Sequence, residues 1–189
     1  MTPLASRRVP PTRLASTIAV AVALFLSACS SSYSSSGAPA NIAGAYNGNI
    51  TNGQSTCPGN WQTGQTAQVT ITAVQSGGTV SLDVTGGAGL YVQLALGAST
   101  FNGTVTGDSV DATLHGKNSQ TAGNCDYTWS ATFDGQLSGD TLSGTVTYAP
   151  VTNGASDCDA KQITGCSEVQ TFNGVRTANA PTGDSGAAD

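Results

Sequence analysis

The chain contains a single histidine, His115, and this residue limits the nucleophilic chemistry that the sequence can support. Catalysis by a serine or cysteine needs a nearby base, and an imidazole usually fills that role. His115 follows the alternating segment 110–114 on its polar side and precedes Gly116 and Lys117, as a solvated turn residue would. We therefore predict no catalytic residues and no enzymatic activity.

The aspartates favour a structural interpretation as well. Asp108, Asp126, Asp134 and Asp140 occupy turn or strand-end positions, where aspartate is common for backbone reasons. The run Asp157-Cys158-Asp159 offers oxygens to calcium but lacks the spaced ligands of a dedicated calcium loop. No Cys-x-x-Cys occurs, and His115 lies far along the chain from the cysteines. We expect no metal site and no cofactor.

Glu168 is the one acidic residue that we expect to point inward. It shares a strand face with Gln170 and Phe172 if the last strand keeps its alternation. An inward carboxylate there is either a ligand contact or a partner for Arg176. The interpretation that we favour makes it part of a polar rim at the mouth of the fold.

The first 28 residues have the composition of an export signal rather than of a folded element. Arg7, Arg8 and Arg13 form a cationic region, and an uncharged, mostly apolar run from 14 to 26 follows. This run is short for a transmembrane helix, which needs about 20 residues. The Arg7-Arg8 pair leaves twin-arginine export open, but residues 9–11 lack the apolar pair expected after it, so we favour the general secretory route.

The signal ends in Leu26-Ser27-Ala28-Cys29, which resembles the lipobox of bacterial lipoproteins. The resemblance implies cleavage before Cys29 and attachment of diacylglycerol and palmitate to that residue. Because Ser30 is not aspartate, it also implies sorting to the outer membrane, on its periplasmic or surface face. An ordinary cysteine near an ordinary cleavage site is the alternative.

Four cysteines remain, Cys57, Cys125, Cys158 and Cys166, and an exported chain permits disulfides between them. Four cysteines allow three pairings, which sequence alone leaves open. We favour Cys57 with Cys125 and Cys158 with Cys166, because the second pair closes the loop that contains it.

After residue 28 the charge is strongly acidic. Lys117, Lys161 and Arg176 are the only cations, against 11 acidic residues. Binding of nucleic acid needs a basic surface for the phosphates, so we exclude a nucleic-acid partner.

The middle of the chain alternates between apolar and polar residues, the pattern of half-buried antiparallel strands. Turn signals rich in glycine separate the segments, as at Gly77-Gly78 and Gly139-Asp140. An aromatic-Asn/Asp-Gly motif recurs at residues 46, 101, 133 and 172, and its glycines leave room for neighbouring rings and let a sheet bend. We expect about nine strands, near residues 44–51, 66–75, 79–85, 90–96, 100–106, 109–115, 124–136, 141–148 and 167–176.

These strands predict an all-β fold, an antiparallel up-and-down β-barrel of about eight or nine strands, with a two-sheet β-sandwich as the alternative. The domain plan is a signal peptide (1–28), a flexible lipidated tether (29–40), the barrel (41–177) and a disordered tail (178–189).

Three positions add a family resemblance. Gly44-Ala45-Tyr46 on the first strand and Arg176 on the last resemble the calycin pattern of lipocalins, with tyrosine in place of tryptophan. The resemblance implies a lipocalin-like barrel in which the arginine packs across the ring. It does not supply a ligand.

Two roles for the domain follow. In the favoured one, the apolar side chains pack together and the lipoprotein is a structural or interaction module that meets an envelope protein through loops 51–63 and 150–165. In the alternative, the barrel binds a small apolar or amphipathic ligand. The cavity would then be lined by Val80, Leu82, Val84, Leu90, Val92, Leu94, Val110, Leu114, Trp129 and Phe133.

Overall fold

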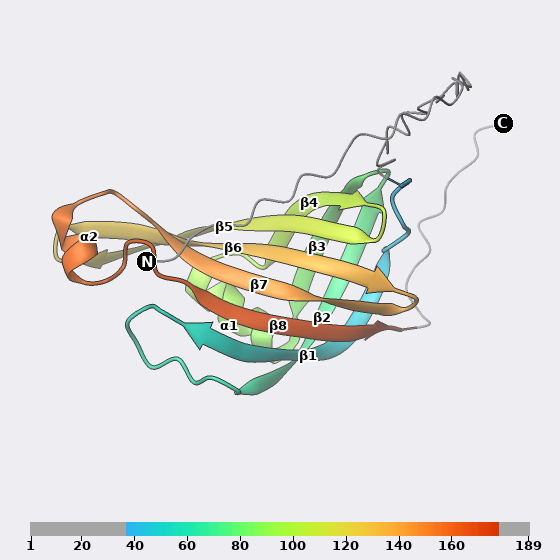
Figure 1. The fold of residues 1–189 in the computed structure, drawn as a ribbon, viewed down its shortest axis with the longest axis horizontal. Helices are drawn as coiled ribbons and strands as arrows, with labels where there is room; N and C mark the ends of the chain where they lie inside the picture. The colour runs from blue at the N-terminus through green and yellow to red at the C-terminus, as the bar shows by residue number, and fades with distance from the viewer. Residues whose placement is uncertain (1–36, 178–189) are drawn as a thin grey trace, which may run out of the picture. The chain divides into compact units, whose positions relative to one another are not determined.

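The computed structural model describes residues 37–177. Their segments of alternating polarity form the strands of a closed antiparallel barrel (Figure 1). Its strands are β1 (Gly44–Ser55), β2 (Thr66–Ser76), β3 (Thr79–Thr85), β4 (Thr100–Thr106), β5 (Ser109–Ala122), β6 (Cys125–Ser138), β7 (Thr141–Thr152) and β8 (Glu168–Arg176). Each strand pairs with the next, and β8 pairs with β1 to close the ring. The predicted up-and-down barrel is confirmed, with eight strands.

Several sequence predictions fall outside the described residues. These are the signal peptide, the lipid site Cys29, residues 29–36 of the tether, and the tail from residue 178. They stay predictions.

The strand predicted at residues 90–96 is wrong, because this segment belongs to the helix α1 (Gly86–Leu96). Ala88, Val92 and Leu96 are buried, whereas Leu90 and Leu94 are 63% and 70% exposed. The buried residues are four apart, which is the spacing of one helix face. Gly97 then ends the helix with a positive φ of 75° and donates its N–H to the carbonyl of Gln93.

A second, short helix, α2 (Ser156–Ala160), lies between β7 and β8. Neither helix of residues 37–177 is long and apolar enough to cross a membrane.

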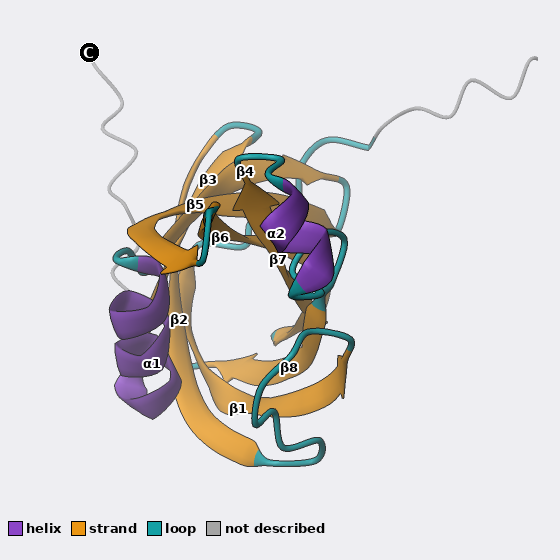
Figure 2. Cartoon of the chain, turned by 90° about the vertical axis from the view of Figure 1, so that its left-hand side faces the viewer, coloured by secondary structure: helices purple, strands orange, loops and turns teal. Residues whose placement is uncertain are grey.

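The two ends of the barrel differ in their connections. At one end, tight turns join β2 to β3, β4 to β5 and β6 to β7, and we call this the short-turn end. The opposite end, which faces the viewer in Figure 2, carries α1, α2 and the β1–β2 loop, and we call it the loop end. Both ends of the described chain lie at the short-turn end, where the N–H of Ala40 bonds to Gly107 and that of Thr177 to Ala45.

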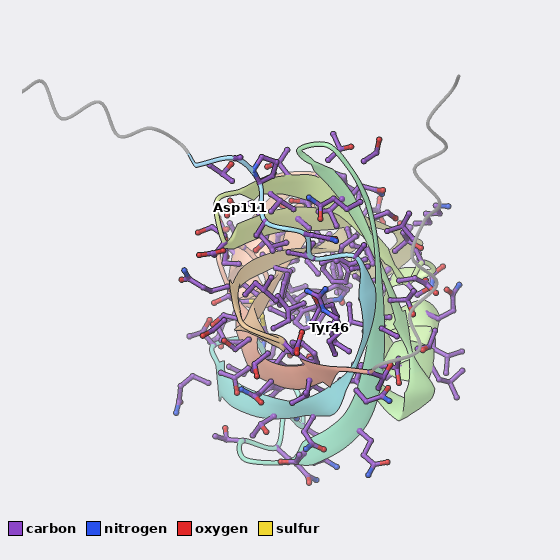
Figure 3. All side chains as sticks on the ribbon, turned by 90° about the vertical axis from the view of Figure 1, so that its right-hand side faces the viewer. Tyr46 and Asp111 are labelled. Atoms are coloured by element: carbon purple, nitrogen blue, oxygen red, sulfur yellow. A yellow bond between two sulfur atoms is a disulfide. The ribbon has the colours of Figure 1, made fainter. Side chains whose placement is uncertain are left out.

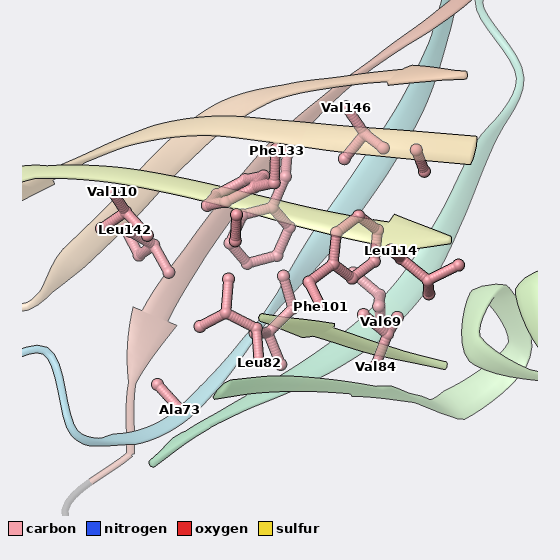
Figure 4. Packing of buried hydrophobic residues seen from close by; sticks show 14 of the residues in the cluster. Val69, Ala73, Leu82, Val84, Phe101, Val110, Leu114, Phe133, Leu142 and Val146 are labelled. Carbon is pink, nitrogen blue, oxygen red and sulfur yellow. The ribbon is translucent and has the colours of Figure 1, made fainter. Parts of the chain in front are cut away.

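Apolar side chains fill the space inside the strands (Figures 3 and 4). Figure 3 places Tyr46 inside the ring and Asp111 on its outer face. The central void, between Leu82, Phe101 and Phe133 among others, has a volume of about 20 Å³. That is room for about one water molecule, whereas ligand pockets measure about 300 Å³ or more. The inward residues therefore form a packed core.

Glycines let this core close. Gly135 on β6 lies directly opposite Gly144 on β7, and a Cβ atom at either position would collide with the ring of Phe133. The aromatic-x-Gly spacing of Phe133 and Gly135 thus makes room for a ring on the same strand face, as predicted.

The short-turn end is closed by Tyr46 and Arg176. The guanidinium carbon of Arg176 lies 5.3 Å from the centre of the Tyr46 ring, and the Tyr46 hydroxyl donates to the carbonyl of Ile42 at 2.8 Å. Arg176 also donates from Nη2 to the carbonyl of Asn41 at 2.8 Å and lies 3.8 Å from Asp140. The contact that the calycin resemblance implies is therefore present.

Two disulfides tie the loop end together, and the favoured pairing is wrong. Cys57 bonds to Cys166, and Cys125 bonds to Cys158. All four predicted cysteines are thus paired. The first bridge spans the seam between β1 and β8, because Ser55 and Glu168 are already partners across it. The second ties α2 to the start of β6.

Candidate functional site

A cleft lies at the loop end, between the β1–β2 loop, α1 and the strands β5 to β8. It consists of two adjoining cavities of about 300 and 210 Å³ that share Trp61 and Tyr91. The larger cavity is lined chiefly by amides and small side chains, the smaller by rings and one carboxylate. We call the two together the loop-end cleft. Both loops that the sequence analysis selected, 51–63 and 150–165, belong to this end of the barrel.

Four aromatic residues line the smaller cavity, and we call them the aromatic cluster: Trp61, Tyr91, Trp129 and Tyr148. Each comes from a different part of the chain, namely the β1–β2 loop, α1, β6 and β7. The rings are therefore brought together only by the closed barrel.

A hydrogen bond fixes one of these side chains and an aromatic contact fixes another. The indole N–H of Trp61 donates to the carbonyl of Gly53 at 2.9 Å. Trp129 packs edge-to-face on Tyr127, with ring centroids 6.2 Å apart, and the Tyr127 hydroxyl donates to Gln120 at 2.9 Å. These contacts hold the two tryptophan rings in place before any ligand arrives.

A chain of hydrogen bonds crosses the mouth of the barrel beneath the cleft. The hydroxyl of Tyr148 donates to Oε1 of Gln170 at 2.8 Å, and Nε2 of Gln170 donates to Oδ1 of Asn52 at 2.7 Å. Burial, with a smaller effect from the charges of Tyr91 and Glu168, raises the pKa of Tyr148 above its ordinary value. The phenol is therefore a neutral donor at neutral pH.

Glu168 points inward, as predicted. It is the first residue of β8, directly opposite Tyr148 on β7, and it lines the smaller cavity. Its neighbours on the same face, Gln170 and Phe172, are 8% and 2% exposed. Desolvation by burial raises the pKa of Glu168, because the charged form loses water. Within residues 37–177 the carboxylate has no hydrogen bond or ion pair, and Arg176 lies at the other end, beside Asp140.

The predicted cavity lining is distributed over four places. Six residues are buried in the packed core as strand residues: Val80, Leu82, Val84, Val110, Leu114 and Phe133. Val92 is also buried, but from α1, and Trp129 lines the loop-end cleft instead of the interior. Leu90 and Leu94 are the error, because the helix turns them to the surface.

The other polar residues singled out from the sequence lie outside this cleft. His115 is exposed on β5 near Lys117. Asp157 in α2 accepts a hydrogen bond from the backbone N–H of Asn124 at 2.8 Å, so it holds the β5–β6 turn. Among residues 37–177, no group of three histidine, cysteine, aspartate or glutamate residues is placed to hold a metal ion.

Comparison with protein-family models, curated proteins and solved structures finds no match for this chain.

The sequence analysis does not identify three of the four rings of the cleft, Trp61, Tyr91 and Tyr148, nor the hydrogen-bonding role of Gln170. A signal existed for Trp61, because it is one of only two tryptophans and lies in a polar loop. Tyr91 was hidden by the wrong strand assignment, which treated it as the wet face of a strand.

Proposed function

We propose that this chain is a lipid-anchored protein of the bacterial cell envelope, held at the outer membrane through Cys29, whose barrel is a non-catalytic interaction module. The likeness of Leu26-Ser27-Ala28-Cys29 to a lipobox supports the anchor. The binding role rests on the loop-end cleft, where rings, amides and a carboxylate converge from separate strands and loops. Such convergence of aromatic surface with a few polar groups is typical of ligand sites.

The position of the chain ends supports the same arrangement. A tether that enters at residue 37 reaches the short-turn end, where Ala40 bonds to Gly107. The loop-end cleft lies at the opposite end of the barrel. The segment that would connect to an anchor at Cys29 therefore joins the barrel at the end away from the cleft.

The packed core of the barrel changes where a ligand could bind in the lipocalin-like alternative. Its barrel contact between Tyr46 and Arg176 is present, but an interior void of about 20 Å³ offers no space for an apolar ligand. We therefore place the ligand at the mouth of the barrel rather than inside it.

The anchor is tested by Cys29→Ser in the producing bacterium. We expect the variant to lose labelling by a fatty-acid analogue and to accumulate as an uncleaved precursor. Normal processing and retention in the outer-membrane fraction would refute the anchor.

The binding role is tested by native mass spectrometry of the full-length protein released from its own envelope with a mild detergent. A bound small molecule should accompany the wild type and be lost in Tyr91→Ala, which removes an exposed ring of the cleft. Leu94→Ala on the same helix is the control, because Leu94 is exposed and lines neither cavity. Equal occupancy in both variants would refute binding in the cleft.

A further inference from the structure

The charge balance of the loop-end cleft is unusual. Glu168 brings a partly buried carboxylate into the smaller cavity, and neither cavity is lined by a lysine or arginine. The cations of the described chain lie elsewhere: Lys117 and Lys161 are exposed, and Arg176 lies at the short-turn end. Partial burial makes the charge on this carboxylate less favourable than in water, so a ligand of opposite charge would be favoured there.

The aromatic cluster adds to the same potential. The face of an aromatic ring carries negative charge density, and a cation within about 6 Å of a ring centre is attracted to it, most strongly by tryptophan. Four rings line the same cavity as Glu168, and the carboxylate is close enough to raise the pKa of Tyr91, after the larger effect of burial. A cation in this cavity would therefore lie among four aromatic rings and beside a counter-ion.

The dimensions define the ligand further. About 210 Å³ accommodates a substituted ammonium group, and the adjoining 300 Å³ offers the side-chain amides of Asn60, Gln62 and Gln65 to a polar remainder. The hydrogen bonds from Trp61 to Gly53 and from Tyr127 to Gln120 hold the surroundings in place.

We propose that the loop-end cleft binds a small organic cation, with its ammonium group between the rings of the aromatic cluster and Glu168 as the counter-ion. This inference rests on the proposed binding function, and it names the chemical class of the ligand. A neutral polar ligand such as a sugar would use the rings and amides equally well and could donate hydroxyl hydrogen bonds to the carboxylate, but it would not neutralise its charge.

The protein supplies its own reporter for the test. Trp61 and Trp129 are the only tryptophans of the chain, and both line the smaller cavity. Intrinsic fluorescence of the full-length protein in detergent is titrated with choline and with 3,3-dimethylbutan-1-ol, which replaces the charged nitrogen by carbon at nearly the same size. We expect saturable binding of choline at least about tenfold tighter than of the alcohol.

Two variants that remove the same charge complete the experiment. Glu168→Gln should weaken choline binding about tenfold and leave the alcohol unchanged. Asp111→Asn removes a negative charge from the outer face of the barrel and should change neither.

Each outcome decides a different point. Equal affinity for choline and the alcohol, or full choline binding by Glu168→Gln, would overturn the cation site and leave the binding function intact. No saturable change with choline, benzyltrimethylammonium or spermidine would also overturn it. The native mass spectra would then decide the binding function separately, because they report any ligand of the cleft.

Discussion

Removal of the Cys57–Cys166 bridge, by the double substitution Cys57→Ala and Cys166→Ala, should cost a large part of the stability of a typical domain, which is about 5–15 kcal/mol. The bridge spans 109 residues of chain. A loop of that length corresponds to about 4.8 kcal/mol of chain entropy in the unfolded state at 25 °C. The Cys125–Cys158 bridge lies within the loop and spans 33 residues, so it shortens the free loop and lowers the expected loss to about 4.5 kcal/mol.

The measurement is equilibrium unfolding in urea, followed by tryptophan fluorescence. Wild type and variant are compared with and without a reducing agent. Because both bridges open under reduction, the difference between the two proteins should then nearly vanish. A loss below about 1 kcal/mol under oxidising conditions, or a difference that persists under reduction, would refute the chain-entropy reasoning.

The pairing itself has an unambiguous assay. Trypsin cleaves after Lys117 and Lys161 and so places Cys57 in one peptide, Cys125 and Cys158 together in a second, and Cys166 in a third. The observed pairing joins the first peptide to the third and leaves the second free with an internal bridge. Either other pairing joins all three peptides, and a mass of that size in a non-reduced digest would refute the structure at this point.

Three further predictions test the helix α1, the loop-end cleft and the short-turn end. Leu96→Ala should cost about 2–4 kcal/mol in urea unfolding and Leu94→Ala less than about 0.5, whereas a strand would bury both alike. Glu168→Gln should raise the free energy of unfolding at neutral pH, because the raised pKa of Glu168 means that ionisation costs the folded state more than the unfolded one. This gain should disappear as the pH falls below about 4, where the carboxyl is protonated in both states, and the same titration at pH 7 and pH 4 checks it. Tyr46→Phe should cost about 1–2 kcal/mol in the same assay, because it leaves the buried carbonyl of Ile42 without its donor; an unchanged midpoint would contradict that role.

The barrel could be predicted because its strands follow the two-residue period closely. Val80, Leu82 and Val84 alternate with polar residues, and tight glycine turns join neighbouring strands, so the order of the sheet follows the order of the chain. The strand prediction for residues 90–96 is wrong for a physical reason. Their apolar residues are compatible with a strand and with one helix face, and only the adjacent Gly97, which ends the helix, favours the helix.

The disulfide pairing was implied by the predicted closure but was not inferred from it. In a closed barrel the first and last strands are neighbours, so Cys57, just after β1, must lie near Cys166, just before β8. The favoured pairing of Cys158 with Cys166 rests only on their short separation in the sequence. The cleft needed tertiary information of the same kind, because Trp61, Tyr91 and Tyr148 belong to segments that meet only when the ring closes.

The bridge across the seam also decides how the barrel would respond to mechanical load. A force that pulls the two chain ends apart acts at the short-turn end, where β1 begins and β8 ends. The hydrogen bonds between these two strands would therefore break one pair at a time, starting near Tyr46 and Arg176. The covalent bond between Cys57 and Cys166 stops this opening at the far end of the seam and carries the force past β2 to β7. A stretched molecule would thus lengthen only by the first and last strands, β1 and β8. The six strands β2 to β7 would stay out of the path of the force.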